Sequence, residues 1–208
     1  MYWRAPLNLA ARQIAERKAA SLMSIQLSSV SHSNTLANIP LGQRLKAYRW
    51  FMGLAGCVLI LDQLTKFAII RRLPLGAYEE PYNIPVIPGF FNLVHVGNAG
   101  AAWSLFSGRN TMLAVLAIGA LCAIIYWRRS LGLRQPLVQV SFGLLCGGIV
   151  GNLIDRLVHH HVVDFLDFHF GSYVYPTFNV ADCGICVGVF LYLFYTLRNP
   201  AEPPATNA

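Results

Sequence analysis

From about residue 50 onward, long stretches of apolar residues are separated by short polar segments. Four such stretches cover residues 50–70, 110–127, 137–158 and 178–197. Each is close to the roughly 20 residues that a helix needs to cross a hydrocarbon core of about 30 Å. None shows the two-residue alternation that is typical of a membrane barrel strand. We therefore predict four transmembrane helices.

The segment between the first two predicted helices, residues 71–109, has a different pattern. Its prolines are Pro74, Pro81, Pro85 and Pro88, and they are followed by an aromatic and β-branched run at residues 89–96. Such a run after proline-rich turns is typical of a strand. We expect a small sheet on the outer membrane surface. The predicted fold class is an all-α membrane protein, a four-transmembrane-helix bundle with this small sheet added.

Composition and charge support a membrane protein and indicate its orientation. Of the residues, 55% are hydrophobic and 12% are charged, and the net charge is +7. Lys and Arg gather before the first predicted helix, between the second and third, and after the fourth: Arg44, Lys46, Arg49, Arg128, Arg129, Arg134 and Arg198, with Arg71, Arg72 and Arg109 as exceptions. Positively charged flanks stay cytoplasmic, so we predict that both termini are cytoplasmic. This asymmetry explains the charge without a nucleic-acid partner.

Three regions follow from these patterns: an amino-terminal arm at 1–45, a membrane-embedded domain at 46–199 and a short cytoplasmic tail at 200–208. The arm has basic residues but no apolar core long enough for a cleavable signal peptide. It could be disordered, could form in part an amphipathic helix at the membrane surface, or could precede a true start at Met23.

Polar residues interrupt the predicted helices, where they are costly and tend to mark function. Asp62 and Lys66 lie four residues apart, a spacing that suits an ion pair along one helix face. A pocket-lining or structural role is favoured for this pair over a catalytic one. In the third helix, Gly143, Gly147 and Gly151 form a small-residue stripe that favours close helix packing.

That stripe leads to Asn152, Asp155 and Arg156 near the outer end of the helix. Adjacent helical residues point about 100° apart, so Asp155 and Arg156 should each find a partner on another element. At the start of the fourth helix, Asn179 and Asp182 share one face. The two helices therefore offer amide and carboxylate groups to a common interior.

Several other groups are weaker candidates for chemistry. Three consecutive histidines, His159 to His161, cannot all point at one metal ion, so we predict no metal site. Cys183 and Cys186 have redox spacing but lie in a predicted membrane helix, where packing explains them better. No serine lies in an arrangement suited to nucleophilic catalysis, and we expect no cofactor.

A pair of carboxylates remains, Asp164 in a short external loop and Asp182 at the outer end of the fourth helix. If the loop folds back so that the two meet, repulsion and burial would keep one proton on the pair at neutral pH. One acid could then activate water to attack a peptide carbonyl while the other stabilises the oxyanion and later helps the amine to leave. Asp167 is a competitor for the role of Asp164.

Five motifs together resemble bacterial lipoprotein signal peptidase, or signal peptidase II. They are Asp62-Gln-Leu-Thr-Lys66, Asn98-Ala-Gly-Ala-Ala-Trp-Ser104, Gly151-Asn-Leu-Ile-Asp-Arg-Leu157, Val162-Val-Asp-Phe165 and Phe178-Asn-Val-Ala-Asp182. The resemblance implies an aspartic endopeptidase with four transmembrane helices and an extracytoplasmic β-cradle. It would cleave diacylglyceryl-modified prolipoproteins on the amino-terminal side of the lipidated cysteine.

Residue by residue, the resemblance places the catalytic dyad on Asp164 and Asp182 and favours Asp164 over Asp167. The implied substrate-binding or supporting residues are Asn98, Gly100, Asn152, Asp155, Arg156, Asn179, Asp62 and Lys66. It also implies the inner (cytoplasmic) membrane, an active site near the outer face, contacts with membrane lipids and inhibition by globomycin, and we expect a monomer. Trp103 stands where the family usually has Phe, and the arm has no usual counterpart.

Two rival functions are also compatible with the sequence. A small proton- or ion-coupled transporter could use Asp62, Asp155 and Asp182, although the chain lacks the internal repeats expected of many carriers. A catalytically silent helix-bundle scaffold is the other. Both predict no endopeptidase activity.

Overall fold

The computed structural model describes residues 17–18, 46–100 and 105–200. The predicted arm and most of the predicted tail therefore lie outside the described residues, apart from Arg17 and Lys18, which are helical. The chain divides into the units Met1–Ala47 and Tyr48–Ala208, and the second carries all the elements described below.

Four long helices form the larger part of this unit: α3 (Arg49–Arg72), α4 (Asn110–Trp127), α5 (Pro136–Val158) and α6 (Val180–Arg198). All four are long and apolar enough to cross a membrane, which confirms the prediction. Their bounds follow from local chemistry. Pro136 opens α5 at a position where its missing N–H costs nothing. Asn179 caps α6, which begins at Val180, two residues after the predicted start.

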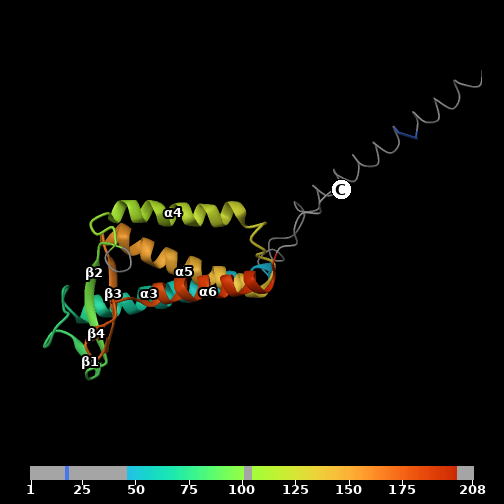
Figure 1. Ribbon diagram of the computed structural model, residues 1–208. Coiled ribbons are helices and arrows are strands. Elements are labelled where there is room, and N and C mark those ends of the chain that lie inside the picture. The colour runs from blue at the N-terminus through green and yellow to red at the C-terminus, as the bar shows by residue number, and fades with distance from the viewer. Residues whose placement is uncertain (1–16, 19–45, 101–104, 201–208) are drawn as a thin grey trace, which may run out of the picture. The chain divides into compact units, whose positions relative to one another are not determined.

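A four-stranded antiparallel sheet connects the helices, in the order β1 (Ile84–Ile87), β2 (Phe91–Asn98), β3 (Val162–Phe170) and β4 (Tyr173–Val174). The run predicted as a strand at 89–96 is confirmed as β2, shifted by two residues. The term all-α was too narrow, because the fold mixes helices with a sheet. Figure 1 shows this sheet at one end of the four helices.

The helix α5 packs closely against both α3 and α6, and glycines make that approach possible. A Cβ atom added at Gly143 would lie 2.8 Å from the carbonyl oxygen of Phe51, and one at Gly147 would lie 2.7 Å from that of Ala55, both in α3. A Cβ atom at Gly148 would lie closer still to the carbonyl oxygen of Ala181 in α6. The glycine stripe therefore sets the spacing between α5 and α3, and Gly148 sets the spacing between α5 and α6.

Candidate active site

The strand β3 holds Asp164, and this corrects the sequence-based expectation of a loop. Asp164 pairs with Val96 of β2 in the antiparallel register. The segment Val162–Phe170 is rich in β-branched and aromatic residues, which favour strands. The strand was not predicted, because Asp164 and Asp167 interrupt the run of β-branched and aromatic residues. A strand holds a side chain more firmly than a loop, so the position of Asp164 does not depend on a loop folding back.

Hydrogen bonds between β3 and the chain before α6 bring the second acid to the first. The backbone N–H groups of Phe165 and Leu166 donate to the carbonyl oxygen of Phe178, at 3.1 and 2.9 Å. Asn179 follows directly and begins α6 with a capping box, in which its side chain accepts from the N–H of Asp182 at 2.9 Å. The carboxylate of Asp182 accepts in return from the N–H of Asn179 at 3.2 Å. Asp182 is thus fixed in the first turn of α6.

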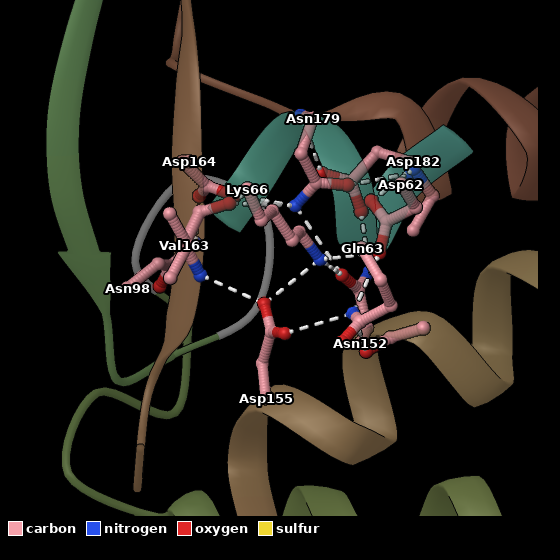
Figure 2. A network of polar contacts seen from close by, with 12 residues as sticks. Asp62, Gln63, Lys66, Asn98, Asn152, Asp155, Val163, Asp164, Asn179 and Asp182 are labelled. Atoms are coloured by element: carbon pink, nitrogen blue, oxygen red, sulfur yellow. Dashed lines mark hydrogen bonds and ion pairs between the residues drawn. The ribbon is translucent and has the colours of Figure 1, made fainter. Parts of the chain in front are cut away.

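Asn179 also joins the two acids through its side chain. Its Nδ2 donates to Oδ1 of Asp164 at 2.7 Å, while its Oδ1 accepts from the Asp182 backbone. The second oxygen of Asp164 accepts from Nδ2 of Asn98 at 2.9 Å. Asn152 donates to Oδ1 of Asp182 at 2.8 Å. Each carboxylate oxygen of the pair therefore has one protein donor, and Figure 2 shows both acids beside Asn179.

The environment of Asp164 favours its neutral form. Its side chain is 2% exposed. Burial, the largest cause, and repulsion from Asp182 raise the pKa of Asp164 from 3.8 to about 7, against the opposing effect of the two amide donors and of Lys66. At neutral pH this carboxyl group can hold a proton, which is the property required of an acid in a catalytic pair.

A pocket of about 1520 Å³ opens over this pair. The predicted site residues that line it are Asn98, Gly100, Asn152, Arg156, Asp164 and Asp182. The lining also includes Ile185 and Val187 of α6 and the residues Val174 to Phe178. A pocket lined by both polar groups and apolar side chains suits a substrate that is partly apolar.

The other predicted residues, Asp62, Lys66, Asp155 and Asn179, are fully buried behind the pocket wall. The expected ion pair is confirmed, with Lys66 Nζ 2.9 Å from Asp62, and Lys66 also lies 2.8 Å from Asp155. These residues thus do not face the cavity.

Arg156 has its partners on other elements, as predicted from helix geometry. Its guanidinium donates to the carbonyl oxygen of Gly100 at 2.8 Å and to Oδ1 of Asn110 at 3.2 Å. Asn110 was not among the predicted site residues. Its position could have indicated a role, because it is a polar residue at the first position of an apolar helix. Gln63 was noted beside Asp62 but given no role, and its Nε2 donates to both Asp62 and Asp155 at 3.1 Å.

The competitor Asp167 belongs to a different cluster. Residues three apart in a strand point to opposite faces, so Asp167 faces away from Asp164. Its carboxylate contacts Nε2 of His169 at 2.6 Å and accepts from Nδ2 of Asn92 at 3.2 Å. It does not line the pocket that holds the pair.

The weaker candidates can also be placed. His160 and His161 line the pocket. Among the described residues, no group of three His, Cys, Asp or Glu side chains could hold a metal ion. Packing was also expected to explain Cys57, Cys122 and Cys146; of these Cys146 is buried in α5, whereas Cys57 and Cys122 are exposed. Cys183 and Cys186 are also exposed and line the pocket, so packing does not explain them.

Comparisons with known proteins agree on one family. The family profile described as signal peptidase (SPase) II matches residues 54–198. A lipoprotein signal peptidase of Maridesulfovibrio salexigens is 42% identical over 146 residues, which cover 68% of this chain and 90% of that protein. One of Bacillus pumilus is 40% identical over 144 residues, covering 69% and 90%. A bacterial membrane enzyme solved by the in meso method is 34% identical with a TM-score of 0.64, covering 74% of this chain and 92% of the other.

Proposed function

The chain belongs to the signal peptidase II family of aspartic peptidases, which cleave the signal peptides of lipoproteins, and from this membership we propose that Asp164 and Asp182 form its catalytic dyad. The observation that supports the proposal most directly is that Asn179 bonds to both acids at the floor of one pocket. Among the predicted polar residues only these two combine a carboxylate with access to that pocket.

The proposed reaction uses a single proton shared by the dyad. Asp164 holds it at neutral pH, because burial and the neighbouring charge raise its pKa to about 7. Asp182, ionised, takes a proton from a water molecule as the water oxygen bonds to the peptide carbonyl carbon. Asp164 donates its proton to the developing oxyanion. When the tetrahedral intermediate collapses, the hydroxyl proton returns to Asp164 as the carbonyl re-forms, the carbon–nitrogen bond breaks, and the amine leaves with the proton that Asp182 took up.

We propose diacylglyceryl-modified prolipoproteins as the substrates, cut on the amino-terminal side of the lipidated cysteine. The apolar wall of α6 at Ile185 and Val187 would face the signal helix or the acyl chains. A substrate with these parts is already placed by the bilayer, so burial positions the scissile bond before any chemistry begins. We also propose that globomycin binds this pocket and that the enzyme acts as a monomer in contact with membrane lipids.

The family and the four apolar helices place the protein in the bacterial inner membrane, as a multi-pass protein. We propose further that both termini are cytoplasmic and that the sheet and dyad lie at the outer face. The distribution of Lys and Arg supports this orientation. The sheet lies at one end of the helices, which is consistent with a site at the membrane boundary (Figure 1).

The first test replaces each acid by its amide in detergent-purified protein. Asp164→Asn and Asp182→Asn should each reduce the cleavage of a lipidated prolipoprotein by at least about 100-fold, because neither amide can transfer the proton. Cleavage is measured as a size shift on a gel, and globomycin should block it in the parent protein.

Asp167→Asn is the matched control, since it makes the same change on the same strand but on the opposite face. It should retain cleavage. Unimpaired cleavage by the Asp164→Asn or the Asp182→Asn protein would refute the dyad assignment. No cleavage by the parent protein would refute the proposed substrate class.

A further inference from the structure

The buried side chains behind the pocket form one connected network centred on Lys66, which Figure 2 shows between Asp62, Asp155 and Asn152. Its Nζ lies 2.9 Å from Oδ2 of Asp62, 2.8 Å from Oδ2 of Asp155 and 2.9 Å from Oδ1 of Asn152. An ammonium group has three N–H donors. All three therefore have an acceptor, and the side chain is only 2% exposed.

The two acids of this network hold the backbone immediately before each member of the dyad. Oδ1 of Asp62 accepts from the N–H of Ala181 at 2.9 Å, and Ala181 precedes Asp182. Oδ2 of Asp155 accepts from the N–H of Val163 at 3.0 Å, and Val163 precedes Asp164. Ala181 lies in the first turn of α6, where N–H groups have no partner within the helix. One ion cluster thus anchors both the strand and the helix that carry the catalytic acids.

Lys66 also fixes the orientation of an amide that touches the dyad. Because an ammonium group carries no acceptor, Asn152 must turn its carbonyl oxygen toward Lys66. The same oxygen accepts from Nδ2 of Asn179 at 3.2 Å. The NH₂ group of Asn152 consequently faces Oδ1 of Asp182, at 2.8 Å. With the opposite amide orientation, two oxygens would face each other at the proposed base.

We propose that Lys66 is a positioning residue for the dyad: its ammonium joins the two backbone anchors and orients the Asn152 amide toward Asp182. This inference rests on the proposed function, because it concerns the geometry of that same pair. Lys66 does not line the pocket, so it has no contact with substrate to lose. Its removal should therefore change the rate of the chemical step and leave substrate binding nearly unchanged.

The central variant is Lys66→Met, which keeps a similar length and removes the charge and its donors. We expect kcat to fall by about 100-fold, since small displacements of catalytic groups have effects of that size, while KM stays within a few-fold. The charge of Lys66 also opposes the raised pKa of Asp164. The alkaline limb of the pH–rate profile should therefore move to higher pH in the variant.

A second variant separates positioning from stability. Lys66→Met leaves Asp62 and Asp155 buried without their cation, which is strongly destabilising. The double variant Lys66→Met with Asp155→Asn removes one charge of each sign, and the new amide oxygen can still accept from Val163. We expect it to recover most of the thermal stability and not the rate. A merely structural Lys66 would give the opposite, a rate that recovers together with the melting temperature.

Arg71→Met is the matched control, since it removes one positive charge from the same helix at a residue that contacts the Phe67 ring. It should cleave at the parental rate. Parental kcat in the double variant, or an unshifted pH profile in both Lys66 variants, would overturn the positioning role. Failure of the proposed function would look different, because the parent protein itself would then not cleave the lipidated precursor.

Discussion

At Asp164, two opposing influences act on one carboxyl group. Burial and the charge of Asp182 favour its neutral form, while amide donors from Asn98 and Asn179 favour its ionised form. The first influence is the stronger, and the pKa of Asp164 rises to about 7. The donors keep both oxygens oriented without removing the proton from the pair. Because the pKa of Asp164 is about 7, the protonation of the proposed dyad changes with pH near neutrality.

We expect kcat/KM to decline as pH rises above about 7, by about tenfold per pH unit once Asp164 is ionised. Above this pH both acids carry a negative charge, and no proton remains for the oxyanion. The measurement is the pH–rate profile of the purified enzyme with a lipidated precursor. The Asp167→Asn protein should give the same profile. A rate that stays level up to pH 9 would contradict the assigned protonation of Asp164.

The same shift has a consequence for stability, with the sign set by proton binding. Folding raises the pKa of Asp164 from 3.8 to about 7, so between these values the folded protein holds a proton that the unfolded chain has lost. The contribution of this group to the free energy of unfolding therefore decreases as pH rises across that window. Asp164→Asn would remove this contribution to the pH dependence.

The sequence predicted which polar residues belong to the candidate site, but it did not predict all the contacts that bring them together. The spacing of Asp62 and Lys66 predicted their ion pair, and helix geometry predicted separate partners for Asp155 and Arg156. The anchoring of Ala181 and Val163 could not be predicted, because those bonds join segments far apart in the chain through backbone N–H groups. The strand at Asp164 was missed because polar residues interrupt its pattern.

Among the elements, α5 determines how closely α3 and α6 approach it, because its glycines lie against their backbones. Gly148 lies against the backbone of Ala181, the residue before Asp182, and a Cβ atom there would also lie 2.8 Å from Cγ1 of Ile185. The stripe of Gly143, Gly147 and Gly151 could be predicted from the sequence, because these glycines recur every four residues. Gly148 stands outside that period, so its contact with α6 emerges only from the packed structure.

Gly148→Ala should destabilise the protein by about 1–3 kcal/mol, the usual effect of overpacking a tight interface. It should also slow cleavage, because α6 must move away from α5 and carry Asp182 with it. Thermal unfolding in detergent and the gel assay measure the two effects. Gly119→Ala in α4 is the control, since nothing lies within 4 Å of the added Cβ atom. Equal melting temperatures for the two variants would contradict the packing argument.

On the scale of the whole molecule, the end of α3 and the start of α6 meet the sheet, so the dyad lies at one end of the helices. The distribution of charge indicates which side of the membrane the sheet end of the helices would face. Three arginines, Arg128, Arg129 and Arg134, lie at the turn between α4 and α5. Basic turns are retained in the cytoplasm. The sheet end would then face outward, where the precursor arrives after export.

Single cysteines can test this orientation in a variant that lacks the five native ones. Tyr82→Cys lies between α3 and β1 at a side chain that is 62% exposed, and Ser130→Cys lies in the exposed turn between α4 and α5. In spheroplasts, a membrane-impermeant maleimide should label the first and should label the second only after lysis. Retained cleavage of a lipidated precursor by each variant serves as the check on folding. The reverse labelling pattern would place the dyad on the cytoplasmic side, where an exported signal peptide could not reach it.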